Sequence, residues 1–270
     1  MDKRTCVNVG CGLSYVEGWL NFDYEPASTA VARANLLGRL PLSADVADVV
    51  YSSHFLEHIP RSRVEGFLAE CFRVLKPGGR IRLVLPDLDE ICREYLRQRE
   101  AGCHARADFV VLELLDQCVR TRSGGDLGRY LGALVASDRQ EMRDYVADRT
   151  GELLREAAAA VAEGRQRNHL HGMLKIRERL ERLYCKAVIA LLPSAFSEQN
   201  VSFSGVGERH AWVYDFHTLS VLLERAGFVS IERMGCDQTK IPEFPIFPLD
   251  MTKSGRPRKG LESMYVEAGK

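Results

Sequence analysis

The chain has 270 residues, of which 46% are hydrophobic and 27% are charged, as is usual for a soluble globular protein. Its length suits one large domain or a core domain that carries an insertion. Lys plus Arg equals Asp plus Glu at 37 each, which argues against a dedicated nucleic-acid-binding protein with its usual basic excess. The longest apolar run, residues 187–192, is too short to cross a bilayer, so we expect no membrane association.

The cysteines and the N-terminus indicate a cellular compartment. Residues 1–6 contain no hydrophobic segment of the kind found in signal peptides. The eight cysteines include no C-x-x-C pair, and most fall within apolar patterns. We therefore expect reduced, mostly buried thiols and a cytoplasmic protein.

A glycine turn follows the first apolar segment of the chain. Residues 7–9 predict a short strand that ends in Gly10-Cys11-Gly12, and a second strand ends at Asp23. Glycines let a ligand approach the backbone closely, and an acid at the next strand end can accept hydrogen bonds from a ribose diol. The pattern predicts a nucleotide-type site. Ten residues separate Gly12 from Asp23, so a helix between these strands must be vestigial or missing.

The rest of the first hundred residues alternates strands with crossovers. An apolar helix face is expected over residues 61–75, where Ser62 and Glu65 have the spacing of a capping box. A second helix is expected after Asp87. Such alternation is typical of a parallel sheet with covering elements. The further strands are expected at residues 31–36, 47–51 and 80–85.

Between residues 101 and 200 the periodicity predicts helices only. We interpret this block as a helical insertion that covers the open edge of the sheet and acts as a substrate cap. Residues 1–100 and 201–270 then form the core domain. The expected helices lie at residues 109–119, 127–135, 142–146, 153–161 and 169–192.

The last seventy residues predict a return to the sheet. A helix is expected after Asp215, which is a suitable N-cap, and it should end at Gly227. Strands at residues 229–234 and 263–268 flank a loop rich in Pro and Lys over residues 240–260. This order predicts a terminal antiparallel hairpin on the parallel sheet.

The order of the motifs resembles the class I S-adenosylmethionine-dependent methyltransferases. More narrowly, it resembles a compact subgroup associated with polysaccharide and natural-product pathways. The resemblance covers about half of the chain and implies an α/β, Rossmann-like, mostly parallel sheet. The segments that carry it are VNVGCG (7–12), GWLNFD (18–23), ANLLGRLPL (34–42), ADVVYSSHFLEHIP (47–60), RVLKPGGRIRLVLPDL (73–88), HAWVYDFHTLSVLLERAGF (210–228) and SMYVEAGK (263–270).

The resemblance implies a site for S-adenosyl-L-methionine. Three positions depart from the family pattern: Asn8 and Asn35 replace acids, and Ser14 replaces the third glycine. Asparagine can still accept a hydrogen bond through its carbonyl oxygen, although Asn35 can equally be a plain loop residue. The residues expected to bind the cofactor are Val9, Gly10, Cys11, Gly12, Asp23, Asn35, Leu36, Ser53 and His54.

Three residues are candidates for catalysis. His54 follows the fourth strand, where an imidazole could accept a proton from the methyl acceptor or simply line the pocket. His210 is a second candidate base in a segment that the resemblance places near the acceptor. Asp87 lies at a strand's carboxyl end, where open sheets bind ligands, but it also has the spacing of an N-cap with Glu90.

Other polar residues have simpler interpretations. Glu57 and His58 are expected to anchor a loop or cap the following helix rather than to catalyse. His169 and His171 open a predicted helix, where side chains two residues apart diverge, so no metal site is predicted. The basic residues of the late loop suggest a solvated surface, although they could meet a phosphorylated acceptor. These basic residues are Lys253, Arg256, Arg258 and Lys259.

Three functions remain open. The first is methyl transfer to oxygen, or less readily nitrogen, on a small-molecule acceptor such as a sugar or natural-product intermediate, by a possible homodimer. The second is a nicotinamide dehydrogenase, which the absent third glycine and the short step to Asp23 disfavour. The third is a methyltransferase-like protein that binds a ligand without catalysis.

Overall fold

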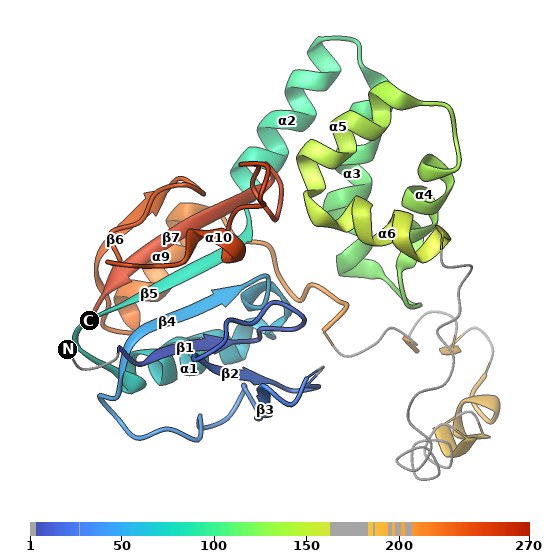
Figure 1. Cartoon of the computed structure of the whole chain (residues 1–270). Helices are drawn as coiled ribbons and strands as arrows, with labels where there is room; N and C mark the ends of the chain where they lie inside the picture. The colour runs from blue at the N-terminus through green and yellow to red at the C-terminus, as the bar shows by residue number, and fades with distance from the viewer. Residues whose placement is uncertain are drawn as a thin grey trace.

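A computed structural model describes residues 4–26, 28–162, 183–185, 187–193, 196–197, 201–202 and 207–270 (Figure 1). His169, His171 and most of the helix expected over residues 169–192 lie outside these described residues. No helix within the described ranges is long and apolar enough to cross a membrane.

The core is a seven-stranded sheet with the order β3-β2-β1-β4-β5-β7-β6. Strands β1 to β5 run parallel, and β7 pairs antiparallel with both β5 and β6. The predicted α/β, mostly parallel sheet with a terminal antiparallel pair is therefore confirmed. Strand β7 lies between β5 and β6, so the pair is built into the sheet. The strands are β1 Cys6–Val9, β2 Leu20–Asp23, β3 Val31–Arg33, β4 Ala47–Ser53, β5 Leu75–Pro86, β6 Val229–Met234 and β7 Ser263–Gly269.

The first crossovers contain no helix, as the short step to Asp23 predicted for the β1–β2 link. Helix α1, Arg61–Val74, is the first α-helix of the chain. The predicted capping box is wrong, because Pro60 occupies the N-cap position and no side chain caps the helix. Ser62 lies inside the first turn, where its hydroxyl cannot take the N-cap role.

Helices α1 and α9, Phe216–Arg225, pack against one face of the sheet. The buried side of α1 carries Val64, Phe67, Leu68, Cys71 and Val74, a spacing that forms one helical stripe. Asp215 caps α9 by accepting a hydrogen bond from the Thr218 amide at 2.6 Å, as the sequence predicted. This face holds the larger apolar core.

The opposite face is covered by the late loop and not by a helical layer. Ile241, Phe244 and Leu249 from this loop pack on Tyr51 and Tyr265 of the sheet. The loop contains one short helix, α10, Ile246–Leu249 (Figure 1). A loop rich in proline therefore completes the second core of the domain.

The helical block lies beyond the end of β5 and not along an edge strand, as Figure 1 shows, which corrects the predicted position of the insertion. The helices are α2 Leu88–Glu100, α3 His104–Val119, α4 Gly125–Val135, α5 Gln140–Thr150 and α6 Glu152–Ala162. Helix α2, which precedes the predicted bounds 101–200, packs along α3, and those bounds stay a prediction.

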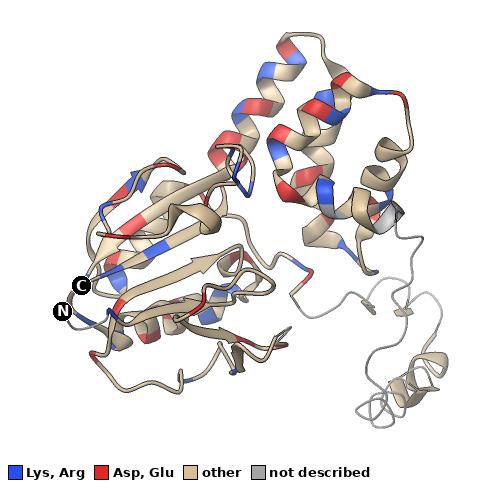
Figure 2. Cartoon of the chain, viewed as in Figure 1, with Lys and Arg blue, Asp and Glu red and all other residues tan. Residues whose placement is uncertain are grey.

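The basic loop joins this helical block to the core. Arg256 pairs with Asp148 at 2.9 Å, and Arg258 pairs with Glu152 at 2.6 Å. The Glu152 amide also donates to the Arg258 carbonyl at 3.0 Å. Basic and acidic residues alternate across the helical block in Figure 2. Arg256 is exposed, as the interpretation of a solvated surface expected, whereas Arg258 is largely covered, so that interpretation was wrong for Arg258.

The eight cysteines are all free thiols, as predicted. Only Cys11 and Cys71 are buried, whereas Cys92 and Cys185 are exposed and the others are half-buried. The expectation of mostly buried thiols was wrong, because an apolar pattern does not tell which side of a short helix faces solvent.

Candidate active site

The glycine turn links the ends of β1 and β2. Gly10 and Gly12 have φ angles of +70° and +53°, a left-handed backbone that favours glycine. The Gly10 amide donates to the Phe22 carbonyl at 2.9 Å, and the Gly12 amide donates to Asp23 Oδ2 at 2.8 Å. A Cβ at Gly12 would meet nothing within 4 Å, so a ligand can approach this backbone. The turn and Asp23 fit the methionyl and ribose parts of S-adenosylmethionine.

Asn8, which replaces an acid of the family pattern, holds the turn from inside. It is buried, and its amide group donates to the Ser14 carbonyl at 2.9 Å. Asn21 lies beside it and donates to the Val16 carbonyl at 3.0 Å. The sequence did not predict that Asn8 and Asn21 lie together. The sequence signal for this contact was an asparagine inside each of two short apolar strands, β1 and β2.

The remaining cofactor candidates contribute unequally. Ala34 donates its amide to the Asp23 carbonyl at 2.9 Å, which brings Asn35 close to Asp23. Asn35 is exposed, and its Oδ1 accepts the Leu37 amide at 3.2 Å. Leu36 is buried in the core. Its side chain therefore packs away from solvent, and only its backbone is available to a cofactor.

The other candidates around the turn are mostly covered. Val9 is fully buried, and its carbonyl accepts a hydrogen bond from Ser52 Oγ at 2.8 Å. Burial raises the pKa of the Cys11 thiol to about 12, with the Asp23 charge as a smaller cause, so Cys11 stays a neutral thiol. Ser53, at the end of β4, is half-buried next to His54. Val9 and Cys11 thus shape the turn more than they offer side chains to a ligand.

A cavity of about 390 Å³ separates the core from the helical block. Pro86 at the end of β5 and His54 after β4 form its core side, and α3 to α6 supply most of the opposite side. Its volume is in the range of small-molecule sites. The lining residues include His54, His58, Glu113, Gln117, Arg120, Glu208, His210, Lys259 and Glu262.

His54 adopts a left-handed backbone with φ of +50°, unusual for a residue with a side chain. Its Nε2 lies 2.9 Å from Ser263 Oγ, and its Nδ1 lies 3.4 Å from Glu57 Oε1. Burial lowers the pKa of His54 well below its ordinary value, and the Lys259 charge adds to this effect. The imidazole is therefore neutral, and its contact with Ser263 orients the ring.

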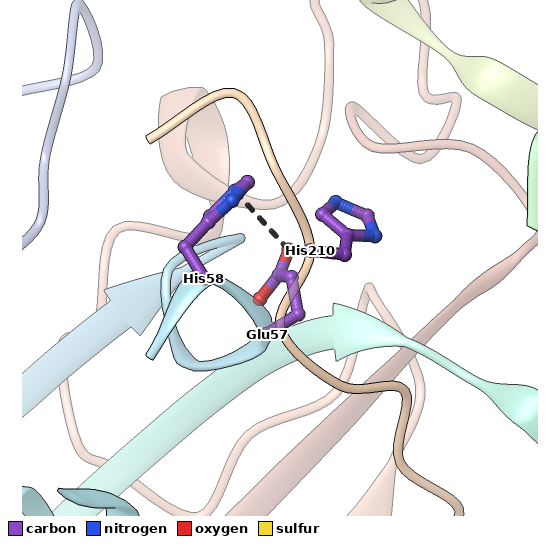
Figure 3. Close-up of side chains that lie close together, drawn as sticks. All are labelled: Glu57, His58 and His210. Atoms are coloured by element: carbon purple, nitrogen blue, oxygen red, sulfur yellow. Dashed lines mark ion pairs between the residues drawn. The ribbon is translucent and has the colours of Figure 1, made fainter. Parts of the chain in front are cut away.

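His58 and His210 lie against each other although they are far apart in the sequence (Figure 3). Their ring centroids are 4.8 Å apart at an interplanar angle of 71°. His58 Nδ1 lies 2.8 Å from the Arg209 carbonyl oxygen. Burial, followed by the nearby His58, lowers the pKa of His210 to about 3, so this ring is also neutral.

Glu57, from the 3-10 helix η1 (Leu56–His58), is the buried acid of this cluster. Its backbone carbonyl accepts the amides of Ala211 and Trp212 at 2.6 and 3.2 Å, and this contact brings His210 to the site. Glu57 therefore anchors a loop, as predicted. Burial raises the pKa of its carboxyl group against the opposing effect of His58.

Asp87 is the N-cap of α2. Its Oδ1 accepts the Asp89 amide at 3.1 Å, and its Oδ2 pairs with Arg233. The side chain is fully buried, and Asp87 is absent from the cavity lining. This geometry supports the N-cap interpretation and gives the catalytic alternative no accessible oxygen.

The cavity contains acidic residues that the sequence reading missed. These acids are Glu113 and Glu262. Arg149 Nη2 lies 2.6 Å from Glu113 Oε2, so Glu113 is paired within the helical block. Burial raises the pKa of Glu262 well above its ordinary value, and Glu113 adds to this effect. The only sequence signal that Glu113 is buried was its position on the apolar face of the helix predicted at residues 109–119.

Comparisons with known proteins match part of the chain to one family. Residues 7–83 match the methyltransferase domain family. A search of curated proteins gives no match. The structural matches include a SAM-dependent methyltransferase from Archaeoglobus fulgidus, with 13% identity over 100% of this chain and 87% of that one, and a TM-score of 0.40.

Two further structures have the same weak similarity. A Thermotoga maritima protein described as a SAM-dependent methyltransferase, possible histamine N-methyltransferase, is 12% identical over 100% of this chain and 84% of that one, with a TM-score of 0.39. The YcgJ protein of Bacillus subtilis is 21% identical, with a TM-score of 0.29. That match covers 36% of this chain and 53% of that one.

The family match contains the glycine turn, Asp23, Asn35 and the strand that leads to His54. The sheet around it is an α/β, Rossmann-like fold, and these residues lie at the carboxyl ends of its parallel strands, where such sheets commonly bind ligands. Residues 7–83 thus match a methyltransferase domain, and this match supports S-adenosylmethionine as the cofactor and methyl transfer as the activity.

Proposed function

We propose that the protein transfers a methyl group to an oxygen atom of a small polar acceptor, such as a sugar or a natural-product intermediate. The observation that carries this proposal is the polar cavity at the ends of β4 and β5. It lies beside His54, which directly follows the strand next to the glycine turn. Membership of the compact polysaccharide and natural-product subgroup belongs to the same proposal.

The residues have separate tasks in this proposal. Gly10 and Gly12 would hold the cofactor along the backbone, and Asp23 would accept hydrogen bonds from its ribose. S-adenosylmethionine supplies a methyl group that its positively charged sulfur activates toward displacement. The helical block excludes water from the cavity and orients the acceptor, which is the main contribution that a protein makes to such a transfer.

His54 accepts the proton of the acceptor hydroxyl in this mechanism. Its Nε2 lies 2.9 Å from Ser263 Oγ, whose own proton goes to the Lys259 carbonyl at 3.2 Å, so the acceptor hydroxyl takes the place of Ser263 at this nitrogen. Burial keeps the ring neutral, which leaves a nitrogen lone pair to accept the proton. His210 is the second candidate for this role, since it also lines the cavity.

Methylation of an amine nitrogen is the alternative. Glu262 supports it, because this buried cavity acid has an oxygen with no hydrogen-bond partner among the described residues. An ammonium group would offset the burial of that carboxylate. A neutral amine acceptor would still need a base such as His54 after methyl transfer.

Calorimetric titration with S-adenosylmethionine, and with NAD as a comparison, tests the cofactor site. Asp23→Ala is expected to weaken S-adenosylmethionine binding at least about tenfold, because a hydrogen bond to a charged group contributes about 1.5–3 kcal/mol. Glu25→Ala is the matched control, since this exposed acid lies two residues away. Absence of heat with S-adenosylmethionine would contradict the proposed function.

Transfer of a radiolabelled methyl group to a panel of sugars, phenols and amines tests the reaction. We expect His54→Ala to keep cofactor affinity but to reduce turnover about a hundredfold, the usual scale for loss of a general base. His217→Ala, an exposed histidine on α9, should retain full turnover. If both His54→Ala and His210→Ala keep the original rate, the proton-acceptor role is refuted and positioning alone suffices. If no acceptor is methylated although the cofactor binds, the protein is a binding protein without catalysis.

A further inference from the structure

Three side chains of the cavity region offer ligand atoms for a metal ion. Glu57 and His58 come from η1, and His210 comes from the segment that precedes α9. One ligand atom from each lies within 4.8 Å of the other two, as Figure 3 shows for the cluster. The hydrogen bond from the Ala211 amide to the Glu57 carbonyl fixes the two segments against each other at 2.6 Å.

The Glu57 carboxylate points to a missing cation. It is fully buried, and neither of its oxygens has a hydrogen-bond partner among the described residues. His54 Nδ1 and His58 Nε2 lie 3.4 and 4.0 Å from Oε1, too far or too poorly aligned for strong hydrogen bonds. Burial of a carboxylate without partners is costly, and a bound cation offsets that cost.

His58 is already oriented as a metal ligand. The Arg209 carbonyl can only accept, so His58 Nδ1, at 2.8 Å, must carry the proton. The lone pair is then on Nε2, the nitrogen on the Glu57 side. A metal-ligating histidine usually donates its other N–H to a carbonyl or carboxylate in this way.

We propose that Glu57, His58 and His210 bind one divalent transition-metal ion, such as Zn²⁺, Mn²⁺ or Fe²⁺. Two imidazoles and one carboxylate suit these ions, whereas Mg²⁺ and Ca²⁺ prefer ligand sets made of oxygen. His58 and His210 line the cavity, so the open coordination positions of the ion face the acceptor space.

The ion then binds an oxygen of the acceptor and holds it for methyl transfer. This part of the inference rests on the proposed function, whereas metal binding itself does not. The sequence predicted no metal site, because nothing in the order of residues joins His210 to the Glu57-His58 pair.

Metal binding is tested on the full chain after treatment with EDTA and removal of the chelator. Titration with Zn²⁺ by calorimetry and with Co²⁺ by visible absorption should each give one ion per chain. Glu57→Gln, His58→Ala and His210→Ala should each lower Zn²⁺ affinity at least about tenfold. His217→Ala, an exposed histidine outside the cluster, is the matched control and should bind as the original chain does.

Circular dichroism of each variant without metal shows whether a loss of binding comes from a lost ligand or from unfolding. If Glu57→Gln unfolds, the test rests on His58→Ala and His210→Ala. Absence of binding, or binding that all three substitutions leave unchanged, would overturn the inference. S-adenosylmethionine titrations on the same samples keep the two proposals apart. Cofactor binding without Zn²⁺ binding refutes the metal site alone, and the reverse result refutes the cofactor site alone.

Discussion

Gly10 and Gly12 share a left-handed backbone but differ in their surroundings. A Cβ at Gly10 would lie 2.4 Å from Cγ of Phe55, a ring that packs on the core, whereas a Cβ at Gly12 would meet no atom within 4 Å. Gly10 therefore has a packing role besides its place in the turn, whereas the space beside Gly12 is open to a ligand. The motif combines close packing against Phe55 at Gly10 with open space at Gly12, and the sequence pattern alone does not distinguish these two requirements.

Alanine substitutions should resolve this difference. Gly10→Ala should lower the free energy of unfolding by about 2–5 kcal/mol, because it adds both backbone strain and overpacking. Gly12→Ala should cost about 1–2 kcal/mol from strain alone, but it should weaken S-adenosylmethionine binding. Urea denaturation and calorimetry measure the two effects. Equal losses of stability in both variants would contradict the separate roles.

At the scale of elements, a buried ion network joins the sheet to the loop that covers its second face. Arg82 on β5 pairs with Glu267 on β7 and with Asp250 after α10, both at 2.7 Å. Tyr51 donates to the other oxygen of Asp250 at 2.7 Å. All three charged side chains are fully buried. The network holds the loop against β5 and β7. The other face of the sheet is covered by helices instead of a loop.

Arg82→Met should destabilise the protein by about 3–5 kcal/mol, because it leaves two buried carboxylates without their cation. Lys76→Ala is the matched control, since Lys76 pairs with Asp48 at 2.8 Å near the surface. An exposed pair contributes about 0–1 kcal/mol. Thermal and urea denaturation compare the two variants. A similar small loss in both would show that the loop is held by its apolar contacts alone.

At the scale of the whole molecule, the helical block meets the core through two glycines. A Cβ at Gly260 would lie 1.9 Å from the Arg149 carbonyl oxygen, and a Cβ at Gly151 would lie 2.1 Å from that of Arg258. The Leu261 amide donates to the Asp148 carbonyl at 3.0 Å across the same contact. This close approach closes one side of the cavity that separates the two parts.

Gly260→Ala should loosen this contact, because the backbones can no longer approach so closely. We expect the amides of Glu152 and Leu261, which bond across it, to exchange hydrogen at least about tenfold faster, as expected when local opening costs less free energy. Hydrogen exchange followed by mass spectrometry measures this change. Gly255→Ala is the control, since it has a similar φ of +74° but open space around it. Unchanged exchange in Gly260→Ala would contradict the role of this contact.

The local patterns predicted most of the elements. The strands, the helices from α3 to α6 and the absent β1–β2 helix follow from periodicity and spacing, because these signals report on residues adjacent in the chain. The pairing of the last strands was also predictable from their order. The glycine turn and Asp23 likewise indicated a nucleotide-type site, and the resemblance of the whole series of motifs implied S-adenosylmethionine.

Only the tertiary structure decided what the distant segments do together. The block from Leu88 lies over the strand ends instead of an edge, and Arg258 joins it to the core. Glu57 meets His210 through a backbone contact that no side-chain pattern encodes. The sequence by itself thus determined the sheet and a nucleotide-type turn, since local chemistry specifies both, and the family resemblance of its motifs implied the cofactor. Long-range packing decided the cavity and the cluster of histidines, because their partners are neighbours only in space.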